Sequence, residues 1–115
     1  MKLYIGKASS PEDIKQKFSD CYPFLKIELH PLGADADVLH KKEVSLKRFT
    51  GLCKEGFVAI NNAVTVSQLE DKFAEFGIAA RVLRKSGKVW VGTLLTDNWT
   101  LQEQNSAGEE ITNQS

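Results

Sequence analysis

The stretch that decides the expected fold is Phe57-Val58-Ala59-Ile60-Asn61-Asn62-Ala63-Val64-Thr65-Val66-Ser67-Gln68-Leu69. Its first four residues form a short apolar run that is typical of a strand. Thr65 and Gln68 have the spacing of a capping box, whose side chains bond backbone amides that the first helical turn leaves free. Gly77 suits a left-handed cap at the end of this helix, and a further strand is expected over residues 78–84. One apolar face of the helix consists of Val66, Leu69, Phe73 and Phe76. The stretch therefore predicts a β-α-β unit.

The N-terminal half repeats this pattern. Residues 2–7 alternate like a short strand, and Ser10 followed by Pro11 predicts the start of a helix. Residues 25–29 alternate apolar with charged side chains, as in a strand with one buried face. A shift of 55 positions lays Ile5 on Ile60, Ser10 on Thr65, Ile14 on Leu69, Phe18 on Phe73 and Leu25 on Ala80. The chain thus contains a weak internal repeat of two β-α-β units.

Two such units predict an α+β domain with the fold of a ferredoxin-like split β-α-β sandwich. Both main helices would lie on one face of an antiparallel sheet. Residues 85–88 form a candidate hairpin turn, because a Ser-Gly pair tolerates a positive φ. Residues 89–93 would then add an extra C-terminal edge strand.

We expect a single α+β domain over residues 1–105. A connecting segment, residues 31–55, joins the two units, and residues 45–54 within it have the apolar spacing of a short helix. Residues 97–105 would close the domain with a turn and a short helix that starts at a second capping box. Residues 106–115 contain few apolar side chains and are expected to form a disordered tail.

The overall charge argues against two classes of partner. Fifteen Lys and Arg balance fifteen Asp and Glu, so the chain lacks the long-range attraction on which nonspecific binders of nucleic acid or anionic membranes rely. No apolar run reaches the length of about 18 residues that a membrane-spanning helix needs. Because no secretory signal is recognisable, we expect a cytoplasmic protein in which Cys21 and Cys53 are reduced.

The titratable residues show no arrangement typical of catalysis or metal binding. His30 and His40 have no cysteine or carboxylate partners at metal-ligand spacing. Asp35 and Asp37 alternate with alanines, but no glutamate closes the pattern of a calcium loop. Phosphate-binding glycine motifs do not occur. The sequence therefore predicts no metal, no cofactor and no catalytic residue, and we expect a protein that is not an enzyme.

A cluster of cations around an aromatic residue is the most distinctive feature. It consists of Arg81, Arg84, Lys85, Lys88 and Trp90. Cations beside an aromatic ring on an open sheet often hold single-stranded nucleic acid. Alternatively, the basic residues protect an edge strand against aggregation and the tryptophan is packed. We take these residues as a candidate binding site.

A second candidate surface is the mixed apolar and polar segment over residues 93–101, which contains Asp97 and Trp99. If Trp99 covers the core, the segment is structural. If Trp99 is exposed, the segment marks a surface for a partner or for self-association.

Motifs in the C-terminal half carry a resemblance to other proteins. They are Arg84-Lys85-Ser86-Gly87, Val89-Trp90-Val91, Thr96-Asp97-Asn98-Trp99-Thr100-Leu101 and Gln104-Asn105. With these motifs the chain resembles an uncharacterised family of small bacterial proteins, and the likeness extends back to residues 65–70. That family has no assigned function, so the resemblance implies a bacterial cytoplasmic origin but no catalytic residue, cofactor or substrate.

The sequence therefore predicts a small non-enzymatic binding or protein-interaction module, whose partner is an unknown protein or a second copy of the chain. One alternative is a regulatory small-molecule-binding domain, with its ligand at residues 7–10 or 61–65, where the two helices begin. The other is a single-stranded nucleic-acid binder that uses residues 84–90.

Overall fold

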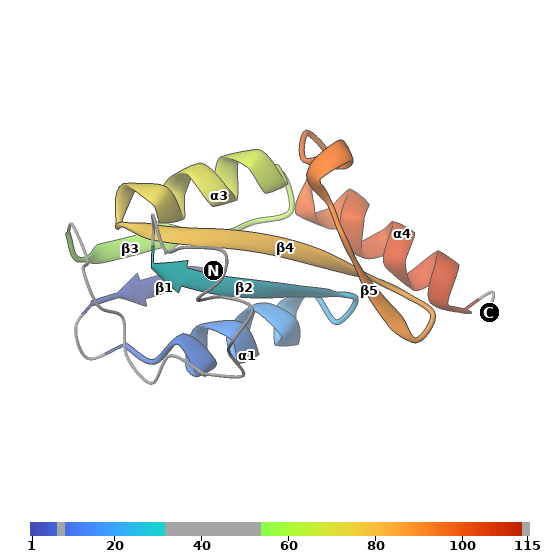
Figure 1. Cartoon of the computed structure of the whole chain (residues 1–115), viewed down its shortest axis with the longest axis horizontal. Coiled ribbons are helices and arrows are strands. Elements are labelled where there is room, and N and C mark those ends of the chain that lie inside the picture. The colour runs from blue at the N-terminus through green and yellow to red at the C-terminus, as the bar shows by residue number, and fades with distance from the viewer. Residues whose placement is uncertain (7–8, 32–53, 114–115) are drawn as a thin grey trace.

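The computed structural model describes residues 1–6, 9–31 and 54–113 (Figure 1). Its strands are β1 (Lys2–Ile5), β2 (Leu25–Pro31), β3 (Gly56–Ala59), β4 (Ile78–Ser86) and β5 (Val89–Gly92). Its helices are α1 (Pro11–Cys21), α3 (Val66–Glu75) and α4 (Leu101–Asn113), with a short 3-10 helix, η1 (Leu94–Thr96). The helix expected within the connecting segment lies outside the described residues. No described helix has the length and apolar character needed to cross a membrane.

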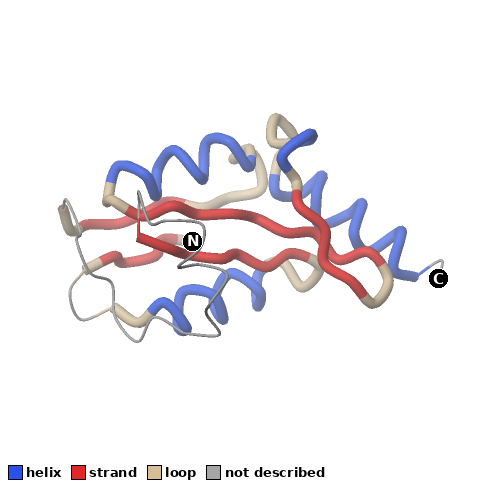
Figure 2. The backbone as a smooth tube through the Cα atoms, in the orientation of Figure 1, coloured by secondary structure: helices blue, strands red, loops and turns tan. Residues whose placement is uncertain are grey.

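The five described strands form two antiparallel sheets (Figure 2). One pairs β1 with β3, and the other has the order β2-β4-β5. The predicted α+β class and the extra edge strand β5 are therefore confirmed. The turn between β4 and β5 is also as expected, with a φ of 65° at Gly87.

The expected ferredoxin-like arrangement is wrong, because that fold needs one continuous sheet and here β2 pairs with β4 in a sheet separate from β1 and β3. The two main helices do lie on one face of the β2-β4 pair, as expected, because α1 packs on β2 and α3 packs on β4, both on the side of the buried Ile27 and Val82. Alternation of apolar residues identifies the buried face of a strand, but it does not determine which strand pairs with which. The sequence pattern fits both arrangements equally well.

The strand register reproduces the internal repeat. Leu3 pairs with Val58 in the first sheet, and Ile27 pairs with Val82 in the second. In each pair a residue meets its own equivalent, 55 positions further along the chain. When a residue lies opposite its own equivalent, a twofold axis passes between the two. The two β-α-β units are therefore related by an approximate twofold axis that passes between Leu3 and Val58 and between Ile27 and Val82.

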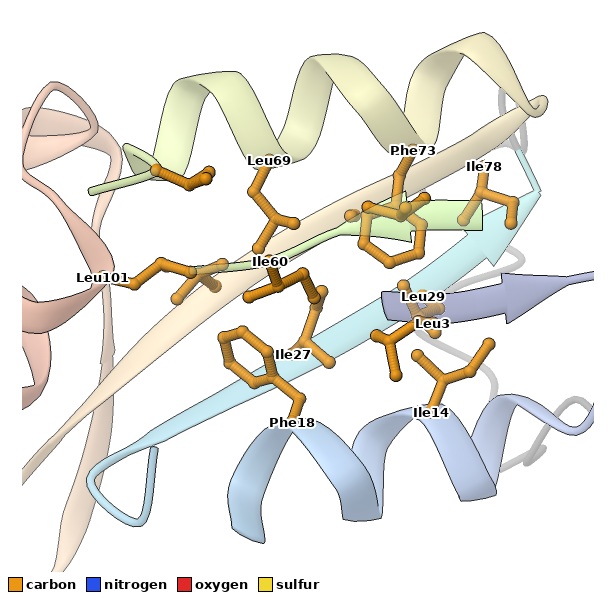
Figure 3. Close-up of a cluster of buried hydrophobic side chains, with 14 of the residues drawn as sticks. Leu3, Ile14, Phe18, Ile27, Leu29, Ile60, Leu69, Phe73, Ile78 and Leu101 are labelled. Carbon is orange, nitrogen blue, oxygen red and sulfur yellow. The ribbon is translucent and has the colours of Figure 1, made fainter. Parts of the chain in front are cut away.

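The core lies between the sheets and the two helices of the repeat. Figure 3 shows Ile14 and Phe18 of α1 and Leu69 and Phe73 of α3 pointing towards the strands. Phe18 and Phe73 are fully buried and are equivalent in the repeat. Removing either ring would cost about 3–5 kcal/mol of stability, because a cavity would replace a large apolar side chain. The capping box of Thr65 and Gln68 is present at the start of α3, as predicted.

Helix α4 corrects the prediction for the C-terminus. Residues 106–113, expected to be part of a disordered tail, continue the helix that Thr100 and Glu103 cap. Its buried positions are Leu101, Gln104 and Gly108, so only one of the three has an apolar side chain that hydropathy would reveal. The helix is held by polar contacts and by close backbone approach, neither of which leaves an amphipathic pattern.

Candidate interaction surface

The alternation of β4 divides the predicted basic cluster between two faces. Val82 is buried, so Arg81 and Lys85 lie on the outer face of the three-stranded sheet and Arg84 lies on the inner face. Lys88 is exposed in the hairpin turn. The five residues therefore do not form one site.

On the outer face, Trp90 of β5 lies opposite Lys85 of β4. Lys26 of β2 reaches across the sheet, and its Nζ lies 5.2 Å from the centroid of the Trp90 ring. The Trp90 side chain remains 38% exposed. Glu28 lies 3.9 Å from the Lys26 ammonium and offsets part of its charge. Sequence reasoning missed Lys26, because its contact with Trp90, 64 residues further along the chain, depends on the register of β2 against β4.

On the inner face, Arg84 binds α4 and does not face solvent freely. Its Nη1 donates a hydrogen bond of 3.0 Å to Oε1 of Gln104, and its guanidinium lies 5.8 Å from the Trp99 ring centroid. Its Nε is buried and has no hydrogen-bond partner among the described residues. Arg84 and Trp99 are therefore parts of the α4 packing, and Arg84 is a poor candidate for contacting a ligand.

The segment between β5 and α4, residues 93–100, is fixed at both ends. We call it the dileucine loop, after Leu94 and Leu95. Towards β4, Thr93 Oγ1 donates to the Val82 carbonyl (2.7 Å). From α4, Gln104 Nε2 donates to the Thr96 carbonyl (2.8 Å) and hydroxyl (2.7 Å). From α3, the Ser67 amide donates to the Asp97 carbonyl (2.8 Å) and the Val66 amide donates to the Trp99 carbonyl (3.1 Å). These partners come from β4, α3 and α4, so three elements fix the backbone of the loop.

This fixed loop exposes two large apolar side chains. Leu94 is 80% exposed and Leu95 is 97% exposed. Trp99, in the same loop, is 38% exposed. The predicted segment therefore contains an exposed apolar surface, but the candidate residues Asp97 and Trp99 contribute mainly backbone carbonyls to the fold. Two adjacent leucines after a strand could equally have belonged to the core, so the sequence held no signal of their exposure.

An acidic side chain of α3, Glu70, binds β4 at Val82, the residue to which the dileucine loop is also anchored. The carboxylate of Glu70 accepts a hydrogen bond from the backbone amide of Val82, next to the carbonyl that Thr93 binds. Burial raises the pKa of Glu70; the Val82 amide opposes this shift, and the charge of Asp97 adds to it. The positive charge of Arg81 acts in the opposite direction to that of Asp97, so the charges around Glu70 are mixed.

The start of α3 offers little to a small-molecule ligand. Its amides at Val66, Ser67 and Gln68 already donate to Trp99, Asp97 and Thr65 respectively. An anion bound there would have to displace these partners. The depression lined by α1 and β2 is shallow and open, about 250 Å³, and contains both acidic and basic side chains.

The described residues contain no group of three His, Cys, Asp or Glu side chains that could hold a metal ion. His30 lies on the outer face of β2, with its Nε2 3.8 Å from a carboxylate oxygen of Glu28. Cys21 is exposed on α1, where its Sγ lies 3.4 Å from the Met1 sulfur. Both of these side chains are remote in the sequence from the dileucine loop.

No protein-family model, no curated protein and no solved structure matches this chain.

Proposed function

We propose that the protein is a cytoplasmic protein-interaction module that inserts Leu94 and Leu95 into an apolar cleft of its partner. The observation that carries this proposal is the exposure of both side chains, 80% and 97%, on a backbone held by β4, α3 and α4.

The energetics favour this use of the loop. Burying a leucine side chain is worth about 2 kcal/mol, so two leucines can supply a substantial part of a micromolar affinity. The loop is already ordered by its hydrogen bonds, so binding would not require much further loss of conformational freedom. Leu94 and Leu95 contribute little to the stability of the fold itself, since their side chains lie in solvent.

The two alternatives fit the geometry less well. A base stacking on Trp90 would compete with Lys26, which already lies over the ring, and Glu28 would repel the phosphates. A small molecule at the start of α3 would compete with the backbone carbonyls of Asp97 and Trp99.

The test compares capture of partners by the purified full chain and by variants, in a reduced cytoplasmic extract of the host with quantitative mass spectrometry. The double variant Leu94→Ser/Leu95→Ser should fold normally, because both side chains are exposed. The matched control is Phe57→Ser, which removes another large apolar side chain that is 64% exposed but lies on β3.

We expect at least one protein to be retained by the wild type and by Phe57→Ser and to fall about tenfold or more with the double variant. That fall corresponds to the loss of about 1.4 kcal/mol of binding free energy. The same protein, once purified, should bind the wild type directly in calorimetry. The proposal would be refuted if every captured protein were retained equally by all three chains.

A further inference from the structure

Strand β5 has a free edge whose backbone groups can be assigned from the register. Ser86 and Val89 flank a two-residue hairpin turn and therefore form its closing hydrogen-bonded pair. It follows that Trp90 and Gly92 direct their backbone N–H and C=O groups away from β4. The same alternation directs the Lys85 amide towards β2, where it donates to the Phe24 carbonyl at 2.9 Å. No described residue outside the β4–β5 ladder bonds the backbone of Trp90 or Gly92.

At four residues this edge strand is short, but it lacks the other usual protection against strand pairing. Edge strands are normally guarded by charged side chains, proline or bulges, but β5 reads Val-Trp-Val-Gly. The basic residues that could have served this purpose, Arg81, Arg84 and Lys85, belong to β4, which is the central strand. Where β4 extends beyond β5, its own edge is covered, because Thr93 and Glu70 bind the carbonyl and amide of Val82. β2, the other edge strand of this sheet, carries Lys26 and Glu28, whereas β5 has no charged side chain.

From this edge we infer that the chain forms a homodimer in which β5 pairs antiparallel with β5 of a second copy. The inference goes beyond the proposed function, because it concerns a different surface and needs no other protein. Pairing centred on Trp90 places this residue opposite Trp90 of the second copy, with Val89 opposite Val91. The backbone groups of Trp90 and Gly92 that face away from β4 are the ones that this register uses.

A second copy fits this edge because the strand is self-complementary. Val89-Trp90-Val91 reads the same in both directions, so antiparallel pairing sets aromatic against aromatic and β-branched against β-branched side chains. Lys88 falls opposite Gly92, where a side chain would meet open space. The two Lys88 residues would be about 14 Å apart along the strand, beyond the screening length in physiological salt. Val89 is 59% exposed and Trp90 is 38% exposed, so the pairing would bury apolar surface.

Cysteine cross-linking tests the register with the purified full chain, in a background in which Cys21→Ser and Cys53→Ser remove the native thiols. Trp90→Cys should form an intermolecular disulfide under mild oxidation, because opposed residues of a hydrogen-bonded pair have Cα atoms about 5.5 Å apart. Lys88→Cys alone should not cross-link. A mixture of Lys88→Cys with Gly92→Cys should cross-link, because these positions face each other. Failure of Trp90→Cys to cross-link, or equal cross-linking by Lys88→Cys alone, would overturn the proposal.

Charge substitution tests the same contact without a covalent bond. Analytical ultracentrifugation should show a concentration-dependent dimer for the wild type and for the control Phe57→Glu. Trp90→Glu and Trp90→Lys should each dimerise at least about tenfold more weakly, since each places like charges opposite each other. An equimolar mixture of the two should recover the dimer. If the wild type is monomeric at all concentrations, or if the mixture remains monomeric, the dimer is refuted. Neither result would affect the dileucine proposal, which is tested with a different partner and different residues.

Discussion

Replacing Gln104 by leucine should destabilise the protein strongly, although the two side chains are similar in size. Gln104 is fully buried in α4 and joins two parts of the structure. Its Oε1 accepts from Arg84 on β4, and its Nε2 donates to the carbonyl and hydroxyl of Thr96 in the dileucine loop. Leucine would keep the packing volume but lose all three hydrogen bonds.

The expected loss is about 3 kcal/mol. The bond to the charged guanidinium contributes about 1.5–3 kcal/mol, and the bonds to Thr96 contribute about 0.5–1.5 kcal/mol each. Thr96 is only half-buried and can recover part of its bonding from water, so the loss lies towards the lower end of the sum. Arg84 recovers less, because its Nε already has no partner among the described residues. For a domain of this size the melting temperature should fall by about 12 °C.

Urea unfolding followed by circular dichroism measures this loss, with Gln102→Leu as the control on the exposed face of α4. The control should change the free energy of unfolding by less than about 0.5 kcal/mol. A double-mutant cycle with Arg84→Met isolates the interaction between the two side chains, and the double variant should be at least about 1 kcal/mol more stable than the sum of single losses predicts. A loss below about 1 kcal/mol for Gln104→Leu, or additive effects in the cycle, would refute the role of Gln104 as the link between β4 and the loop.

Two further substitutions test the surroundings of the loop and of α4. Because the pKa of Glu70 is raised from 4.5 by burial, the native state holds the proton more tightly than the unfolded state, and stability falls as the pH rises through the raised pKa. Glu70→Gln keeps an acceptor for the Val82 amide and should therefore be more stable than the wild type at pH 7. This advantage should disappear below about pH 4, where Glu70 is protonated in both the native and the unfolded state. If the urea midpoints of the two proteins differed by the same amount at every pH, burial would not be the cause of the raised pKa. Gly108→Ala adds a Cβ that would lie 3.0 Å from the Phe24 Cβ and 3.1 Å from the Phe24 carbonyl oxygen, so it should lower stability by about 1 kcal/mol despite the better helix propensity of alanine. Ser106→Ala on the exposed face should be neutral or slightly stabilising, and a Gly108→Ala variant that melts above it would show that α4 does not pack this closely.

The local structure of the chain was largely predictable because it depends on short-range chemistry. Thr65 and Gln68 define the start of α3 through bonds that close within one helical turn. Gly87 adopts the positive φ that the hairpin turn requires. The repeat also anticipated that Phe18 and Phe73 would have equivalent buried positions.

Pairing of the strands and the limits of α4 could not be predicted in the same way. The apolar faces of β2 and β4 would be equally buried in several strand orders, so only the whole set of contacts selects one. Gln104 and Gly108 look like surface residues in a sequence, yet one is buried by its hydrogen bonds and the other by the close approach of Phe24. The contact of Lys26 with Trp90 was hidden for the same reason, because it follows from the sheet register. The separation of Arg84 from Lys85, in contrast, follows from strand alternation alone and could have been read from the sequence.

The twofold register also has a consequence for the way in which the chain is made. Every pair between β1 and β3 and between β2 and β4 joins a residue before position 32 to one after position 55. While the ribosome has synthesised only the first half, β1 and β2 have none of these partners, and their apolar faces remain exposed to chaperones or to other nascent chains. Such distant contacts also impose a large loop-closure entropy before any sheet forms, so folding should be slow for so small a protein and should be completed only after β4 has emerged from the exit tunnel.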